Sequence, residues 1–173
     1  MTSRSDAQRG KRERGGPPRG RRGGTAPVAA VGYSGTPLVK KLGFKAGDVA
    51  VLLGDDGAIR AAIGEVPDGV EVQGTLPRRA GTVDIVLVTV TSERELVKVL
   101  QRAARAMKVE GMVWVCWPKK ASGVVSDVTE DVVRAVGLER GLVDVKVCAV
   151  TAVWSGLKFV VPLKSRGAWA EDR

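Results

Sequence analysis

The amino-acid sequence predicts a three-layer α/β fold with a mostly parallel sheet. Strand-like and helix-like segments alternate along the chain. The segment DIVLVTV, beginning at Asp84, is apolar at both parities, as expected for a strand covered on both faces. Two further strand-like segments near the end of the chain are separated by a short turn. Alternating strands and helices favour parallel crossovers with helices on both faces, and the final hairpin adds one antiparallel strand.

The first half of the chain contains two short helices and two short strands. Ser34 or Thr36 is expected to cap a helix that has Pro37 at its first position and ends at Gly43. Apolar runs flanked by Gly, Asp and Pro predict a strand at 49–53, a helix at 58–63 and a strand at 70–73.

The second half begins with the most clearly marked helix. Ser92 and Glu95 form a capping box, and apolar residues recur at spacings of three and four from Leu96 to Met107. A strand at 112–117 follows, and then a helix that starts near Asp127 and ends or kinks at Gly137. Strands at 143–150 and 157–163, with a turn at 154–156, predict the closing hairpin.

The chain is predicted to consist of a basic tail, residues 1–29, one folded domain, residues 30–165, and a short C-terminal tail, residues 166–173. The first 29 residues hold eight Lys or Arg and two Asp or Glu, so they carry +6 of the total +9. Their Gly, Pro and Arg content predicts disorder. They suit weak binding of nucleic acid, although a solvated tail and a start codon assigned too far upstream are alternatives. The candidate tail residues are Arg12, Arg14, Arg19, Arg21 and Arg22.

The composition argues against a metal site, a disulfide bond, a membrane span and a signal peptide. The chain has no histidine, which removes the usual general base and zinc ligand, and we expect no metal site. Cys116 and Cys148 lie in apolar runs and are expected to be buried thiols rather than a disulfide. No long apolar segment indicates a membrane span or signal peptide, so we expect a cytoplasmic protein. The absence of asparagine and the scarcity of isoleucine suggest a GC-rich bacterial genome.

From about Leu42 to Leu163 the order of elements resembles the class I methyltransferase variant of the Rossmann fold. The resemblance rests on the stretches LGFKAGDVAVLLG, DIVLVTV, LVKVLQRAARAMKVEGMVWVCW and VDVKVCAVTAVWSGLKFVV. More narrowly, the words GYSGTPLVKKLG, WPKKASG, D-x-TED and WSGLKF resemble an uncharacterised bacterial family, a domain of unknown function, which implies no activity.

The class I resemblance implies S-adenosylmethionine as cofactor, held by a Gly-rich turn after the first strand and an acidic residue at the end of the second. This chain departs from both patterns. The turn reads Gly54-Asp55-Asp56-Gly57, with two glycines, and the second strand ends at Gln73. We therefore expect no cofactor in the leading hypothesis and retain S-adenosylmethionine as an alternative.

Several distinctive sequence motifs are predicted to lie together at the carboxyl ends of the strands, where open parallel sheets bind ligands. The two lysines of the WPKKASG motif follow a buried strand at this edge, where they could bind a phosphate, a carboxylate or an acidic peptide. The tryptophans provide flat apolar surface for a ring or a partner side chain. The alternatives are solvated lysines and tryptophans that cap the core. The candidate ligand-binding residues are Tyr33, Ser34, Gly35, Thr36, Gly54, Trp117, Lys119, Lys120, Ser122, Trp154, Ser155 and Lys158.

Three functions follow from these observations. The leading hypothesis is a non-catalytic or diverged methyltransferase-like domain that binds an anionic small molecule or an acidic protein surface. The alternatives are an active S-adenosylmethionine-dependent methyltransferase and a nucleic-acid-associated protein that uses its basic tail. No catalytic residue is predicted, because no Ser or Cys has a visible base partner, and Asp127 and Glu130 are expected to cap their own helix. No membrane partner is expected, and the oligomeric state stays open.

Overall fold

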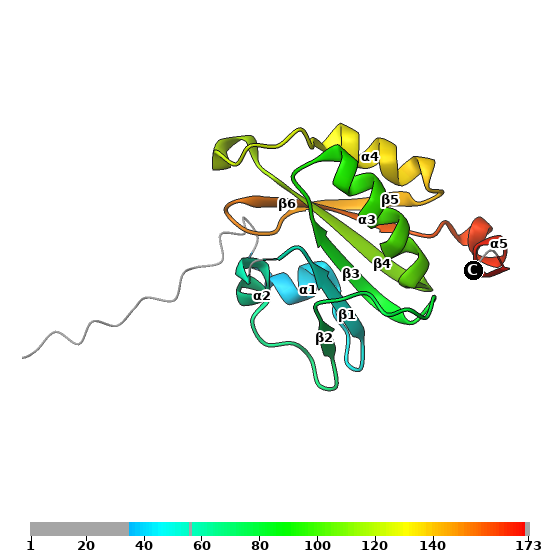
Figure 1. Ribbon diagram of the computed structural model, residues 1–173. Coiled ribbons are helices and arrows are strands. Elements are labelled where there is room, and N and C mark those ends of the chain that lie inside the picture. Colours follow the sequence, from blue (N-terminus) through cyan, green and yellow to red (C-terminus); the bar gives the residue numbers. More distant parts are fainter. Residues whose placement is uncertain (1–34, 56, 172–173) are drawn as a thin grey trace, which may run out of the picture.

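A six-stranded sheet with strand order β2-β1-β3-β4-β6-β5 forms the centre of the fold in the computed structural model, which describes residues 35–55 and 57–171 (Figure 1). Strands β1 to β4 are parallel, and β6 is antiparallel to both β4 and β5. This arrangement confirms the predicted α/β fold with one antiparallel strand. The strands are β1 (Val49–Leu53), β2 (Glu71–Gln73), β3 (Val83–Thr89), β4 (Met107–Pro118), β5 (Val143–Ala149) and β6 (Trp154–Val160).

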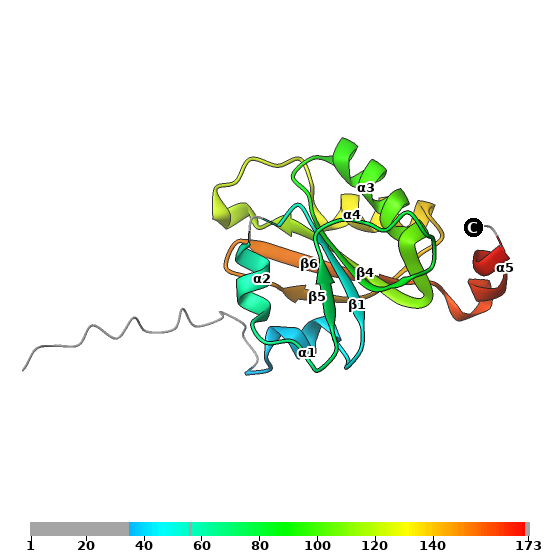
Figure 2. The same ribbon diagram turned by 60° about the horizontal axis from the view of Figure 1, so that its bottom comes forward.

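Helices cover both faces of the sheet and create two separate cores (Figures 1 and 2). One face packs against α3 and α4 through a cluster that includes Leu96, Leu100 and Phe159. The other packs against α1 and α2 through a cluster that includes Leu42 and Trp114. The helices are α1 (Leu38–Leu42), α2 (Ala58–Ile63), α3 (Glu93–Ala106), α4 (Glu130–Glu139) and α5 (Arg166–Glu171), with 3-10 turns η1 (Lys120–Ser122) and η2 (Leu163–Ser165).

Strand β3 lies between β1 and β4 and is buried on both faces, because Val86 and Val88 enter one core cluster and Ile85 and Leu87 enter the other. Its polar residue at the amino end, Asp84, has a structural role. The Asp84 carboxylate accepts a hydrogen bond from the Val49 amide at 2.9 Å and forms an ion pair with the Lys108 ammonium at 2.8 Å. It therefore ties the first residue of β1 to β4.

The structure corrects four local predictions. Helix α1 begins after Pro37, which occupies the N-cap position without a side-chain cap. Helix α4 begins at Glu130 rather than near Asp127. Gly137 lies inside α4, where the Phe159 ring packs against it and leaves no room for a β-carbon. Strand β4 starts at Met107, five residues before the predicted position of 112.

The closing hairpin turns earlier than the sequence suggested. Trp154 is the first residue of β6, and the turn lies at 151–153. The Thr151 hydroxyl accepts hydrogen bonds from the Val153 and Trp154 amides, and the Val150 amide donates to the Trp154 carbonyl. A threonine side chain therefore shapes this turn, rather than the Ser-Gly pair that follows it.

The predicted C-terminal tail contains helix α5, which packs on the domain. Trp169 on α5 is half-buried against the core cluster of α3 and α4. In both ribbon views α5 lies at the end of the sheet opposite the β5–β6 turn and η1 (Figures 1 and 2). The predicted basic tail, with Tyr33 and Ser34, lies outside the described residues.

Candidate functional site

The carboxyl ends of β1, β3 and β4 form one rim. The register pairs Leu53 with Val88 and Thr89 with Cys116, so the residues that follow these strands begin at one level. The chain runs from β1 outward to β2 and then returns to β3 on the other side of β1. The gap between the ends of β1 and β3 is thus a topological switch point, which is where open α/β sheets bind ligands.

Gly54 follows the last residue of β1 at this switch point, and its lack of a side chain is required by packing. Its φ is +74°, and a β-carbon there would lie 2.7 Å from Thr89 Oγ1 and 2.8 Å from the Thr89 carbonyl oxygen. The Thr89 hydroxyl in turn donates to the Leu53 carbonyl at 3.2 Å. The turn after β1 therefore lies directly against the end of β3.

The next acidic residue, Asp55, is turned toward helix α2. Its carboxylate accepts hydrogen bonds from the Ile59 amide at 3.0 Å and the Arg60 amide at 2.8 Å. These are amide groups that a helix start would otherwise offer to an anion. Gly57, with φ +100°, faces open space, because a β-carbon there would meet no atom within 4 Å.

Gln73 is the last residue of β2 and is exposed. It pairs with Val51, two positions before the end of β1. Its side chain offers one amide donor pair and one acceptor at the position where the resembling fold implies a carboxylate. The end of β2 therefore carries an amide at the position where the resembling fold implies an acid.

Lys119 and the hairpin turn lie together at the same rim, one strand away from the switch point. Pro118 faces Trp154 across the β4–β6 pair, and the Lys119 amide donates to the Val153 carbonyl at 2.8 Å. The Lys119 ammonium also donates to the Thr151 carbonyl at 2.8 Å. The predicted meeting of the WPKK word and the hairpin is therefore present, but Lys119 uses one of its donors to hold the turn.

Other residues of the WPKKASG motif also make contacts within the chain. The Ser122 hydroxyl donates to the Lys119 carbonyl at 2.6 Å and accepts from the Val124 amide at 3.3 Å. Trp117 is only 7% exposed and belongs to the core, so it offers little surface to a ligand. Lys120 is exposed on η1, and Trp154 and Ser155 are half-buried at the start of β6.

Lys158 is separated from this group along β6. It pairs with Trp114, four residues before Pro118, and its Nζ lies 3.9 Å from the β-carbon position of Gly43 at the end of α1. Burial lowers the pKa of Lys158, and the nearby Lys146 and Lys45 lower it further. Gly35 and Thr36 are exposed just before α1.

The prediction that Asp127 caps its own helix is wrong, because Asp127 caps α3 instead. Its carboxylate accepts from the Glu93 amide at 2.8 Å, at the start of α3, while Thr129 caps α4 by accepting from the Val132 amide. The Asp127 amide and the Ser126 hydroxyl both bond the Thr91 carbonyl. The segment after η1 is therefore fastened to the end of β3 and closes one side of the rim.

The two cysteines are free thiols on one face of the sheet, which confirms the expected absence of a disulfide between them, but only Cys116 is buried as predicted and Cys148 is half-buried. Both pair with Gly156 from opposite sides, so β6 separates them. Burial raises the pKa of Cys116, and Cys148 and Asp55 add to this effect, which excludes a reactive thiolate at neutral pH. Within residues 35–55 and 57–171, no cluster of three or more His, Cys, Asp or Glu suits a metal ion.

None of the helices in the described part of the chain combines the length and hydrophobicity needed to cross a bilayer.

Solved structures with a similar fold include several methyltransferases. An S-adenosylmethionine-dependent methyltransferase from Aquifex aeolicus matches with a TM-score of 0.55 and 15% identity, over 72% of this chain and 88% of that one. The mitomycin 7-O-methyltransferase MmcR matches with a TM-score of 0.52 and 16% identity, over 72% and 53%. PigF, solved with S-adenosylhomocysteine, matches with a TM-score of 0.52 and 11% identity, over 73% and 60%. The chain has a methyltransferase-like fold.

No family model and no curated protein matches the sequence. At 11% to 16% identity, the structural matches establish architecture and not activity. The narrower resemblance to a domain of unknown function stays a prediction.

Proposed function

We propose that this protein binds S-adenosylmethionine at the switch point between β1 and β3 and acts as a methyltransferase. The observation that carries the proposal is the Gly54 turn, which packs against Thr89 where the strand order reverses, in a fold shared with methyltransferases. Bound there, the cofactor supplies an electrophilic methyl group. The chain's own residues position it and shape the space that a methyl acceptor enters.

The residues present fit this cofactor in part. Gly54 and Gly57 place no side chains at the end of β1, and Gly57 faces open space. Gln73 supplies an amide for the ribose hydroxyls, which gives a weaker hydrogen bond than a carboxylate does. Asp55 occupies amides of α2, so those groups do not contribute to the binding of the cofactor. Affinity is thus expected to depend on the turn and on Gln73.

Gln73 offers a sharper test than Gly54. A Gly54→Val change would place atoms on the Thr89 backbone and unfold the rim, so loss of binding would carry no information about the cofactor. Gln73→Glu instead restores the acid on an exposed strand end. We expect it to tighten binding of S-adenosylmethionine and S-adenosylhomocysteine by about five- to tenfold, because a charged acceptor adds about 1 kcal/mol to a hydrogen bond.

Isothermal titration calorimetry with both compounds measures this effect. The matched control is Glu71→Gln, which changes an exposed side chain on the same strand two residues away. The control is expected to leave affinity unchanged. The cofactor proposal fails if the wild type gives no binding heat with either compound, or if Gln73→Glu and Glu71→Gln shift the affinity equally.

A second candidate is binding of a carboxylate or phosphate group, from a small molecule or an acidic protein surface, on the hairpin side of the rim. Lys120 is exposed there, and Trp154 is partly accessible. Because Lys119 and Ser122 are engaged within the chain, Lys120 carries this candidate. Lys120→Glu is then expected to abolish binding of inorganic phosphate or an oligoglutamate peptide, while Lys164→Glu, at another exposed lysine, leaves it intact. Equal behaviour of the two variants removes this candidate.

A further inference from the structure

The exposed face of α3 carries a row of cations that the proposed cofactor site does not use. The helix runs from Glu93 to Ala106 and has four exposed cations, at positions spaced by three or four residues. At 100° per residue these positions fall within about 80° of one another, so they share one face. The four cations are Arg94, Lys98, Arg102 and Arg105. We call them the α3 row.

None of the α3 row is neutralised by an ion pair within residues 35–55 and 57–171. This contrasts with Arg134 on the neighbouring helix α4, which contacts Glu130, Asp131 and Asp144. The unpaired positive charge on α3 is one of two such concentrations, because Lys45 and Lys146, near Lys158, also make no ion pair within the described residues. It is not a general excess, because the chain outside its first 29 residues holds 20 basic and 17 acidic side chains.

The adjoining loop extends this charge at the far end of α3. Arg78 and Arg79 are exposed in the loop before β3. The loop is fastened to the end of α3, because the Gly81 amide donates to the Arg105 carbonyl at 3.1 Å and the Thr82 amide donates to the Ala106 carbonyl at 2.9 Å. Six cations thus follow one another across α3 and the loop.

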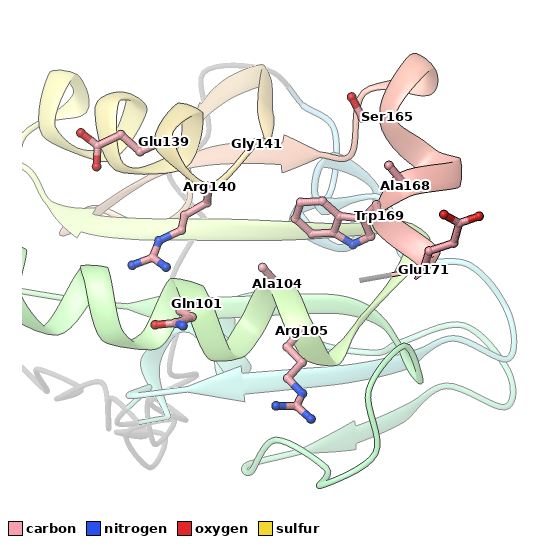
Figure 3. Close-up of a pocket in the computed structure, with 10 residues that line it drawn as sticks. All are labelled: Gln101, Ala104, Arg105, Glu139, Arg140, Gly141, Ser165, Ala168, Trp169 and Glu171. Atoms are coloured by element: carbon pink, nitrogen blue, oxygen red, sulfur yellow. The ribbon is translucent and has the colours of Figure 1, made fainter. Parts of the chain in front are cut away.

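The α3 row passes two hollows in the surface. One of about 370 Å³ runs beside Arg94, Lys98 and Arg102. The other, of about 1100 Å³, lies between the ends of α3 and α4 and helix α5 (Figure 3). Its lining includes Trp169, the cations Arg105 and Arg140, and the carboxylates Glu139 and Glu171. The half-buried Trp169 ring points from α5 toward α3, above Ala104 (Figure 3). The row of cations therefore ends beside an aromatic ring.

We propose that the α3 row and the groove at Trp169 bind a single strand of nucleic acid. Cations that track a backbone, with an aromatic side chain on which a base stacks, are the features by which proteins hold single strands without reading sequence. From Arg94 to Arg105 the helix rises about 16 Å. At about 3.4 Å per nucleotide, this length spans about five nucleotides.

The surface is less suited to a lipid bilayer. The large exposed apolar side chains lie on other elements, and none is on α3. A membrane-binding helix places apolar residues beside its cations so that they enter the acyl region. The α3 face has cations and Gln101 where such residues would be needed. Binding of vesicles is therefore an outcome of the test and not the proposal.

Fluorescence anisotropy of the full chain with labelled oligouridylate and oligothymidylate of about 20 nucleotides tests the inference. The variant is Lys98→Gln with Arg102→Gln, which keeps helix propensity and removes two charges. We expect it to weaken binding about five- to tenfold at low salt, and to lower the slope of log affinity against log salt by about 1.4, or about 0.7 for each lost phosphate contact.

The matched control is Lys40→Gln with Lys45→Gln, two exposed lysines in and just after α1, away from α3 and the groove at Trp169. It removes the same charge at positions outside the α3 row, so it is expected to keep the wild-type salt slope. Equal effects of the two double variants overturn the inference, because binding then follows net charge alone. Binding of a duplex of the same length at least as tightly overturns it too, as does binding to phosphatidylserine vesicles without binding to either oligonucleotide. The proposed cofactor is not involved in any of these measurements.

Discussion

The Lys119 ammonium and the Thr151 carbonyl are joined by a 2.8 Å hydrogen bond between the end of β4 and the β5–β6 turn. This contact explains why a lysine stands at the exit of a buried strand. Its aliphatic stem leaves the core edge, and its charged end satisfies a carbonyl of the turn. Lys120, the next residue, is exposed on η1, and its side chain is available to solvent. The two adjacent lysines therefore have different roles.

Replacement of each lysine separates these roles. Lys119→Met is expected to lower the free energy of unfolding by about 1 kcal/mol, because the Thr151 carbonyl loses a charged donor. Lys120→Met is expected to change it by less than about 0.5 kcal/mol, as is usual for an exposed position. Urea denaturation measures both values. Equal values for the two variants would show that the contact with Thr151 adds nothing to stability.

Gly137 provides a test in which packing opposes helix propensity. Inside α4 an alanine would ordinarily stabilise by about 1 kcal/mol, but here its β-carbon would overlap the Phe159 ring. We expect Gly137→Ala to destabilise the protein by about 1–2 kcal/mol net. Gly167 in α5 is the control, because a β-carbon there would meet nothing within 4 Å. Thermal unfolding should show a loss for Gly137→Ala and no loss for Gly167→Ala; the same sign for both would contradict this account.

Asp127 is expected to stabilise α3 rather than its own segment. Asp127→Ala removes the acceptor of the Glu93 amide and should cost about 1 kcal/mol, whereas Asp127→Asn should keep most of the stability. Asp131 has a 97% exposed side chain and makes only a 3.7 Å ion pair, so Asp131→Ala serves as the control and should cost less than about 0.5 kcal/mol. Hydrogen exchange of the first amides of α3 reports the site of the effect. Unchanged protection of the Glu93 amide in Asp127→Ala would refute the assignment.

The lowered pKa of Lys158 predicts that the free energy of unfolding depends on pH. Burial and the neighbouring Lys146 and Lys45 lower its pKa in the folded state below the unfolded value of 10.5. The unfolded chain then binds more protons between these two pKa values, so this group makes stability rise with pH in that alkaline window. Below the window the charged Lys158 opposes folding. Lys158→Met is therefore expected to raise the free energy of unfolding at pH 7 by less than about 1 kcal/mol, since solvent screens the half-buried ammonium.

Urea denaturation of wild type and Lys158→Met at pH 7 and above pH 10.5 measures this dependence. The advantage of the variant should shrink as the pH rises, because the wild-type lysine becomes neutral. Lys40→Met, at an exposed lysine of α1, is the control and should change the free energy of unfolding at pH 7 by less than about 0.5 kcal/mol. A constant advantage at both pH values would contradict the prediction.

The order of strands and helices could be predicted from local patterns, because those patterns are set by burial within each segment. The strand at Val49–Leu53 and the capping box at Ser92 and Glu95 have their signals within a few residues. The contacts that sequence spacing missed join distant segments. Asp127 acts on Glu93, 34 positions earlier, and Gly137 is kept small by Phe159 on another strand.

The position of the candidate rim could be predicted from the sequence, but the contacts between its side chains could not. A parallel sheet brings the strand ends together whatever the side chains are, so Gly54, Lys119 and the hairpin could be placed at one edge from topology alone. Which side chains remain available depends on hydrogen bonds that no local pattern contains. Lys119 and Ser122 turned out to be engaged within the chain, and the α3 row was not singled out, because regularly spaced cations on a helix look like an ordinary solvated face.

Backbone amide NMR of the full chain, titrated with S-adenosylhomocysteine, tests most directly whether the carboxyl rim is a cofactor site. The proposal predicts shifts confined to the turn at 54–58, to the end of β3 near Thr89 and to Gln73, with no change at α5. Absence of shifts, or shifts centred on Trp169 and the groove beside it, would contradict it.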